Sequence, residues 1–469
     1  MKVGRALGMA IAAMHLTSCS LSDLLDAPNP SLIEPESVQS AAGATAVRNG
    51  ALARLRTMTA NGESSWMFGG LLADEWATSS TFIQNDETDQ RSIQLNNGTV
   101  NANLRALYRA RTAANQAIVL LNTYKPTPVA DIAEMHFVRG FAELQLASDF
   151  CNGIPLSDGS GTTAVLGNPV PVDSVFGAAI ASFDSAITIT AALATAAEIS
   201  INRATRIAKA RALLGRGLTN APAAAALVAG IPTTYRYDVT ASLTGGDNTL
   251  WNQAASANRY TVSDSAQGNN RSFLVANAIP FRAAADRRVP ARYRRSGVDT
   301  VKSQDGNTFA IIVDSLWGQT SAVAVTHGID ARLIEAEAFL QAGNAASWLS
   351  TLNTLRGTAI QITAPSPTAT GTHPGWTVPV MAALVDPGAA GRVALHFREM
   401  AFWQFGRGHR LGNLRRMIRD YGYPADGSGN YPTGNHFKGG VYGKDLNLPV
   451  TTDEQTGNPN FRACLDRKA

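Results

Sequence analysis

Hydrophobic side chains recur every three or four residues in four segments of the chain, at residues 103–124, 131–150, 203–218 and 328–343. This spacing places them on one face of an α-helix, so each segment is predicted to be an amphipathic helix. Small residues recur on these faces, which lets helices pack closely in pairs, as in tetratricopeptide-type repeats. The apolar faces contain Leu107, Ala110, Ala114, Ile118 and Leu121; Ala133, Phe137, Gly140, Phe141 and Leu144; Ile207, Ala210, Leu214 and Leu218; and Ile329, Leu333, Ala336 and Leu340.

The pattern changes between and after these helices. Residues 232–320 hold Gly, Asn, Ser, Thr and scattered aromatics with one strand-like run, "FAIIVDSLW", and residues 421–469 are rich in Gly, Pro, Asn and Tyr. We therefore predict one mainly α body over residues 37–469, with loop-rich, little-β insertions. Loops on a rigid scaffold commonly carry binding function, so these two regions are expected to form the ligand side. The helical scaffold is expected at about residues 37–230, 321–358 and 390–420.

The N-terminus has the pattern of an export signal. Lys2 and Arg5 precede a short apolar run at residues 6–16, which is too short to span a bilayer. The next residues, "LTSC", resemble a bacterial lipobox that ends at Cys19. The resemblance implies a signal peptide at residues 1–18, cleavage before Cys19 and acylation of that cysteine. The alternative is an ordinary signal peptide with an incidental cysteine. Residues 19–36 contain three prolines and are expected to form a lipidated tether.

Charge does not point to nucleic acid. The formal net charge is +4, and removal of Lys2 and Arg5 with the signal peptide leaves +2. A nucleic-acid-binding surface needs a stronger basic excess than this.

Two cysteines remain after Cys19, namely Cys151 and Cys464. An even number of cysteines in an exported protein favours a disulfide, and the segment around Cys464 has too little apolar content to hold itself in place. We predict a Cys151–Cys464 bridge. The alternative is two unrelated buried thiols.

Several motifs in order along the chain resemble the SusD/RagB family of outer-membrane nutrient-binding lipoproteins. The match covers nearly the whole length after the lipobox. The motifs are "LLDAPNP" at 24–30, "LLADE" at 71–75, "AEMHFVRGFAELQLASDFCNGIPL" at 133–156, "ARLIEAEAFLQAG" with "LNTLRG" at 331–343 and 352–357, "GHRLGNLRR" at 408–416 and "LPVTTDEQTGNPN" at 448–460.

This resemblance implies a SusD-like fold and a role in uptake. Such proteins lie on the outer face of the outer membrane, pair with a TonB-dependent β-barrel transporter (SusC-like), and deliver oligosaccharides or sometimes peptides to it. They do not cleave the ligand. The alternative function is a surface-anchored helical-repeat interaction protein without a small ligand.

The sequence contains no motif that would make the chain an enzyme. Gly-x-Ser-x-Gly, the phosphate-binding loop and His-Glu-x-x-His are all absent, and no two histidines have metal-ligand spacing. "DGSGN" at 426–430 resembles half a calcium loop, but the twelfth position is Phe437, so we expect no metal and no cofactor. Asp74 and Glu75 could in principle serve glycoside hydrolysis, although caps and surface charges are the simpler interpretation.

Sugar binding needs exposed aromatic faces with polar side chains nearby. Tryptophans in loop-like surroundings, together with the aromatic and polar residues after the "LLADE" motif, are the candidates. For each of them, buried packing is the alternative. The candidate ligand-binding residues are Trp76, Phe82, Asn85, Asp86, Trp251, Trp317 and Trp376. Trp348 and Trp403 lie in helical segments and are expected in the core.

The segment at residues 281–297, "FRAAADRRVPARYRRSG", contains six arginines. One interpretation is a site for an anionic ligand such as a uronic-acid glycan. The favoured interpretation is a structural loop whose arginines are satisfied by carboxylates and carbonyls, with Arg287 beside Asp286 as its best example.

Overall fold

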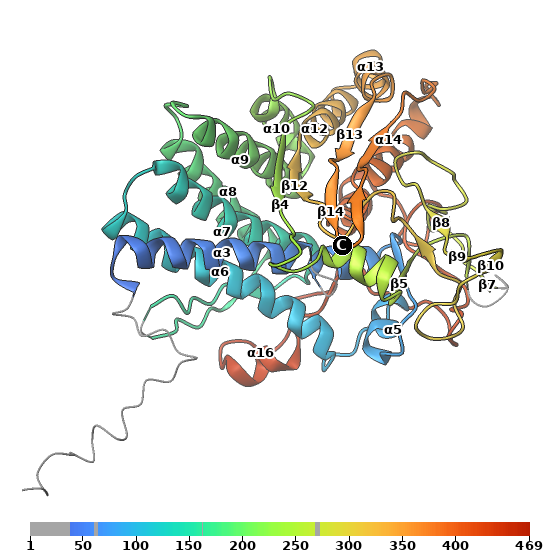
Figure 1. Ribbon diagram of the computed structural model, residues 1–469, viewed down its shortest axis with the longest axis horizontal. Helices are drawn as coiled ribbons and strands as arrows, with labels where there is room; N and C mark the ends of the chain where they lie inside the picture. Colours follow the sequence, from blue (N-terminus) through green and yellow to red (C-terminus); the bar gives the residue numbers. More distant parts are fainter. Residues whose placement is uncertain (1–37, 61–63, 162, 268–272) are drawn as a thin grey trace, which may run out of the picture.

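The computed structural model describes residues 38–60, 64–161, 163–267 and 273–469. The predicted signal peptide, Cys19 and the tether lie outside the described residues. Figure 1 shows the long helices α6, α7, α8 and α9 on one side and the short strands β7 to β10 on the other.

Helices form most of the regular structure, which confirms the predicted mainly α class. Each of the four segments predicted from apolar spacing is helical over most of its length. Helix α6 contains the first, and α7, α9 and α12 end one to three residues before the predicted ends of the others. The helices are α3 (Ala41–Thr59), α4 (Ser65–Leu72), α5 (Ile83–Asp89), α6 (Gly98–Tyr124), α7 (Val129–Asp149), α8 (Val172–Ile189), α9 (Ala196–Gly215), α10 (Ala221–Val228), α11 (Thr249–Trp251), α12 (Gly328–Gln341), α13 (Ala345–Arg356), α14 (Ala389–Trp403), α15 (Arg410–Tyr421) and α16 (Thr452–Gly457).

Successive long helices pack side by side, from α6 through α7, α8, α9 and α10 to α12 and α13, with α3 against α6. Small residues make this possible. At Gly140 in α7, an added Cβ would lie 2.7 Å from Cε1 of Phe183 in α8, so only glycine allows these two helices to approach so closely. Polar caps begin several of them, as where the Asn97 side chain accepts from the backbone N–H of Val100 at 2.9 Å.

Helix α8 is long and apolar enough, by length and composition, to cross a membrane. It lies between α7 and α9 and buries Val175, Phe176, Ala179 and Phe183. This is the packing of a helix within the helical body, in which small and apolar side chains are needed on both contact faces.

Strands are short, and within the described residues they pair only two by two, always antiparallel. The strand-like run at 309–317 contributes only Ile311–Ile312, and the start of the expected helical range 321–358 is strand β12 rather than helix. The pairs are β1 (Trp76–Thr78) with β5 (Tyr260–Val262), β2 (Ile154–Pro155) with β3 (Pro169–Val170), β4 (Arg236–Val239) with β12 (Val323–His327), β6 (Ala266–Gln267) with β7 (Phe273–Leu274), β8 (Arg292–Tyr293) with β11 (Ile311–Ile312), β9 (Arg295–Ser296) with β10 (Asp299–Thr300), β13 (Ile360–Thr363) with β16 (Trp376–Val378), and β14 (Ser366–Thr368) with β15 (Gly371–His373).

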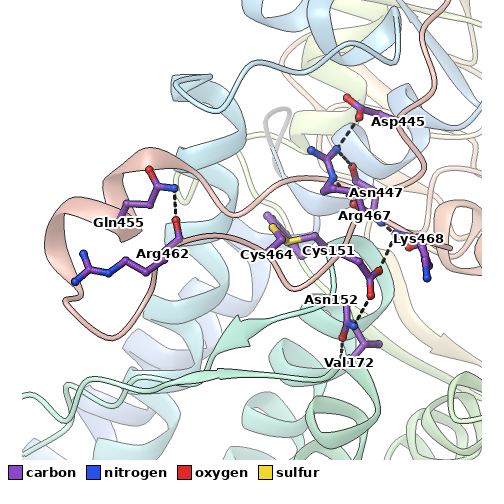
Figure 2. The surroundings of a disulfide bond; sticks show 12 residues. Cys151, Asn152, Val172, Asp445, Asn447, Gln455, Arg462, Cys464, Arg467 and Lys468 are labelled. Atoms are coloured by element: carbon purple, nitrogen blue, oxygen red, sulfur yellow. Dashed lines mark hydrogen bonds and ion pairs between the residues drawn. A yellow bond between two sulfur atoms is a disulfide. The ribbon is translucent and has the colours of Figure 1, made fainter.

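The last residues of the chain are fastened to the end of α7. A disulfide joins Cys151 to Cys464, with the two Cα atoms 6.0 Å apart. Figure 2 shows the bridge together with Asn152, whose Nδ2 donates to Asp466 at 2.9 Å and whose carbonyl accepts from the N–H of Leu465 at 2.7 Å. The predicted bridge is thus present, and backbone and side-chain hydrogen bonds reinforce it.

Candidate functional site

Two of the sequence motifs meet in the core as ion pairs. Arg410, in the "GHRLGNLRR" motif, donates from Nε and Nη2 to the carboxylate of Asp74 in "LLADE", at 2.6 and 2.7 Å. Arg407 binds Asp330 at the start of α12 in the same way, at 2.6 and 3.1 Å, and the pairing holds the pKa of Asp330 well below its usual range. All four side chains are buried, so these ion pairs hold the scaffold together rather than contact a ligand.

Glu75 lies beside this cluster and is nearly inaccessible to solvent. Its Oε1 accepts a hydrogen bond from the N–H of Gly406 at 3.0 Å. Burial raises the pKa of Glu75 to about 8, and the neighbouring Asp74 contributes to the rise. Asp74 and Glu75 are therefore neither helix caps nor surface charges, and their burial leaves no room for a scissile bond between them.

Trp76 and Trp317, two of the predicted ligand contacts, belong to the core. Trp76 is 1% exposed and Trp317 3% exposed, and both rings pack on Phe405, with centroids at 5.0 and 6.3 Å. Side chains so enclosed have no face for a sugar, so the prediction is wrong for these two. The cause is the turn after α4, which directs Trp76 into the interior as part of strand β1. Trp348 and Trp403 are buried, as predicted.

Phe82, Asn85 and Asp86 come together at helix α5, but only Phe82 is well exposed, at 48%. Asn85 is buried and donates from Nδ2 to the hydroxyls of Ser80 and Tyr260, at 3.2 and 3.0 Å. Asp86 accepts from Thr78 Oγ1 at 2.9 Å and from the ammonium of a lysine. Asn85 thus supports the loop, while Phe82 presents an aromatic ring to solvent.

The ring of Phe82 has a cationic neighbour that sequence reasoning missed. The guanidinium carbon of Arg259 lies 5.3 Å from the centroid of the ring, within the range of a cation–π contact. Arg259 follows the π-helical turn Asn252–Ser256, directly before strand β5. We call Phe82 and Arg259 the Phe82–Arg259 pair.

Hydrogen bonds among four chain segments hold this pair in place. The N–H of Ser79 donates to the carbonyl of Arg259 at 2.9 Å, and the Oγ of Ser79 donates to the carbonyl of Asn258 at 2.9 Å. From a third segment, the N–H of Gln304 donates to the carbonyl of Asn258 at 3.2 Å. From a fourth, Lys438 Nζ donates to the carbonyl of Ser80 at 2.5 Å. The backbone beneath the pair is therefore fixed by hydrogen bonds between segments that are distant in the sequence.

The remaining two tryptophans are half-buried. Trp251 ends α11, just before the π-helical turn. Trp376 donates from Nε1 to the carbonyl of Arg287 at 3.0 Å, with the Arg287 guanidinium 5.9 Å from its ring centroid. Both retain partial exposure, and their role as ligand contacts stays a prediction.

The arginines of segment 281–297 are mostly satisfied internally. Arg288, rather than Arg287, pairs with Asp286 and also with Glu399, and it is buried. Arg292 pairs with Asp314 at the surface. This supports the structural interpretation of the segment, with the central ion pair shifted by one residue from the expected Arg287.

Two larger grooves, each of about 680 Å³, lie elsewhere. The first, beside α3 and β4, is lined by Arg56, whose guanidinium is occupied by the carbonyls of residues 245–247. The second lies beside the C-terminal segment, where Arg415 donates to three carbonyls at the end of α7. The arginines of both grooves already have partners. Among the described residues, no cluster of three or more His, Cys, Asp or Glu could hold a metal ion.

Solved structures share this architecture. A SusD-like protein from Bacteroides fragilis matches with a TM-score of 0.62 at 11% sequence identity, over 92% of this chain and 98% of its own. A SusD-like carbohydrate binding protein from the same species matches at 0.61 and 13%, over 91% and 99%. NanU of B. fragilis matches at 0.60 and 12%, over 94% and 100%.

No family model and no curated protein matches the sequence. At these identities the structures establish the fold, and the chain has the SusD-like fold over the 91–94% of its length that these structures cover. The fold implied by the ordered motifs is confirmed.

Proposed function

We propose that the protein is a lipid-anchored protein of the outer membrane that captures oligosaccharides, or peptides, at the cell surface. The observation that carries the proposal is the exposed Phe82 ring with Arg259 beside it, in a chain with the SusD-like fold. Two of the similar solved structures support a sugar ligand. They are SusD-like carbohydrate binding proteins, one from Bacteroides fragilis and one from Bacteroides vulgatus. Aromatic faces suit the apolar C–H groups of a pyranose.

The captured ligand is delivered to a TonB-dependent β-barrel transporter, for which the protein acts as a lid. Figure 1 shows α5 and β5 on the opposite side of the molecule from α8 and α9, so the helical scaffold is free to contact a large partner while the Phe82–Arg259 pair receives a ligand. The protein binds without cleaving, which agrees with the burial of Asp74 and Glu75. Cys19, outside the described residues, supplies the lipid anchor.

The test of capture is a glycan array probed with the full-length protein in detergent, with a peptide library as the second arm. Binding of defined oligosaccharides, weakened by Phe82→Ala, is expected. Absence of any bound glycan or peptide would leave the helical-repeat interaction protein as the better description.

Anchoring and delivery have separate tests. Mass spectrometry of membrane-extracted protein should show an acylated N-terminal Cys19, and Cys19→Ala should abolish acylation. Pull-down from detergent-solubilised outer membranes should recover a large β-barrel partner, because permanent complexes commonly bury more than about 2,000 Å². Recovery of an intact Met1, or of the monomer alone, would contradict the respective proposal.

A further inference from the structure

In the described part of the chain, the guanidinium of Arg259 has no ion-pair partner. The side chain stacks over Phe82, its buried Nε has no hydrogen-bond partner among the described residues, and its backbone bonds to Ser79 and Gln253. Among the described residues, no carboxylate lies within ion-pair distance of its guanidinium. A guanidinium offers five N–H donors in a planar fork that matches a carboxylate, and Arg259 is partly exposed, so a ligand can reach this fork.

The carboxylates near the pair have partners other than Arg259. Asp86 and Asp305 face this region from α5 and from the loop at 303–308, and Lys438 lies between them, 2.7 Å from the first and 3.9 Å from the second. Asp305 further accepts from the N–H of Thr308 at 2.8 Å. The carboxylates that approach the site are therefore already engaged.

Two further cations on the same framework have no carboxylate partner in the described part of the chain. Arg294 reaches the carbonyl of Ser256, three residues before Arg259, with a long 3.4 Å contact. Lys302 is exposed and forms an isolated antiparallel β-bridge with Phe309. By contrast, the arginines that line the two large grooves are bound to backbone carbonyls or ion-paired.

We propose that the Phe82–Arg259 pair is a subsite for a carboxylate-bearing sugar, so that the oligosaccharide captured by this protein is acidic. The inference rests on the proposed capture of oligosaccharides and names the class of glycan. The pyranose packs on the exposed part of the Phe82 ring, and its carboxylate accepts hydrogen bonds from the Arg259 fork. A charge-assisted, planar contact of this kind discriminates against a neutral sugar, which leaves the fork unpaired.

The experiment compares acidic and neutral ligands on the full-length protein in detergent. A glycan array containing neutral, uronic-acid and sialic-acid oligosaccharides identifies the tightest binder. Calorimetric titration then compares that glycan with its methyl ester, which keeps the sugar and removes the charge. We expect the ester to bind about ten- to a hundredfold more weakly, and the affinity for the acid to fall as salt rises.

Three variants locate the effect. Arg259→Gln should lower the affinity for the acidic glycan as much as esterification does. Arg259→Lys should lower it less, because lysine keeps the charge without the planar fork. Arg462→Gln is the matched control: Arg462 is exposed, and in Figure 2 its side chain points away from the residues drawn around it. Unchanged thermal unfolding of each variant shows that it is folded.

The outcomes separate the two proposals. If neutral glycans bind as well as acidic ones and Arg259→Gln has no effect, the acidic subsite is overturned while capture of oligosaccharides stands. If no glycan binds, or if only acidic peptides bind, both the subsite and glycan capture fail. Equal losses of affinity for the acidic glycan in Arg259→Gln and Arg462→Gln would also overturn the subsite, because the change in net charge alone would then explain the result.

Discussion

The guanidinium of Arg410 and the carboxylate of Asp74 form a two-pronged ion pair across 336 positions of the sequence. The same carboxylate accepts from the N–H of Ile279 at 2.8 Å, and Arg410 also donates to the carbonyl of Gly429 at 2.8 Å. One buried pair thus links the end of α4, the start of α15 and two segments of the loop-rich side.

Removal of one partner should destabilise the whole protein. Asp74→Ala leaves the Arg410 charge buried and unpaired, which typically costs about 3–5 kcal/mol in the free energy of unfolding. Urea denaturation measures this directly. The control is Arg292→Ala, which breaks a pair with Asp314 that is largely exposed and should cost less than about 1 kcal/mol. Similar losses in the two variants would show that burial does not govern the strength of the Asp74 pair.

Glu75 should make stability fall as the pH rises. Because burial raises its pKa from 4.5 to about 8, the folded protein keeps the proton that the unfolded chain releases above about pH 4.5. The stabilisation is complete below pH 4.5 and is lost as the pH approaches 8. Burial raises the pKa of Asp149 to about 7, which acts in the same direction.

The histidines oppose this trend at lower pH. Burial lowers the pKa of His136, His327 and His409. Below about pH 6.5 these histidines are protonated in the unfolded chain but stay neutral in the folded protein, so stability falls as the pH falls. The informative range is therefore pH 7–8.5. There, Glu75→Gln should flatten the decline in the free energy of unfolding, since the amide keeps the acceptor for Gly406 without ionising. If the free energy of unfolding of this variant declines with pH as steeply as that of the wild type, groups other than Glu75 cause the decline.

The disulfide should contribute measurably to stability. Cys151 and Cys464 are separated by 313 positions, and closing a loop of this length restricts the unfolded chain by about 6 kcal/mol in the chain-entropy model, with measured values often lower. Reductant should lower the melting temperature of the wild type and leave Cys464→Ser unaffected. Non-reducing peptide mapping should find the two cysteine peptides linked. Free alkylation of both thiols in denaturant without reductant would show that they are not bridged.

The helical part of the fold was predictable because its signal is local. Leu107, Ala110, Ala114 and Leu121 are buried on one face of α6, as their spacing indicated, while Ile118 lies at the edge of that face. Most strands were not predictable, since they are two or three residues long, too short for a period-two pattern to appear. The longest, β12, is buried along its whole length and so shows no alternation of buried and exposed positions.

The candidate site was predictable only in part. Phe82 follows a recognised motif, so its region could be identified. Arg259 could not, because its place beside Phe82 depends on backbone hydrogen bonds among residues 79–80, 258–259 and 304, which are far apart in sequence. The residues around Trp76 in the sequence are compatible with an exposed ring that binds a sugar and with a buried ring. Only its packing on Phe405, which is distant in the sequence, shows that the ring is buried.

Phe82 and Trp76, six positions apart, should separate binding from stability. Phe82 is 48% exposed, so Phe82→Ala should change the free energy of unfolding by no more than about 0.5 kcal/mol, yet weaken the proposed glycan contact by more than about 1 kcal/mol. Trp76→Phe should do the reverse, lowering stability by about 1–3 kcal/mol through loss of packing on Phe405 while the folded protein binds normally. Urea denaturation and calorimetric titration of the same preparations measure both effects. Loss of affinity in Trp76→Phe with Phe82→Ala unaffected would move the ligand contact to Trp76 and refute the assignment to Phe82.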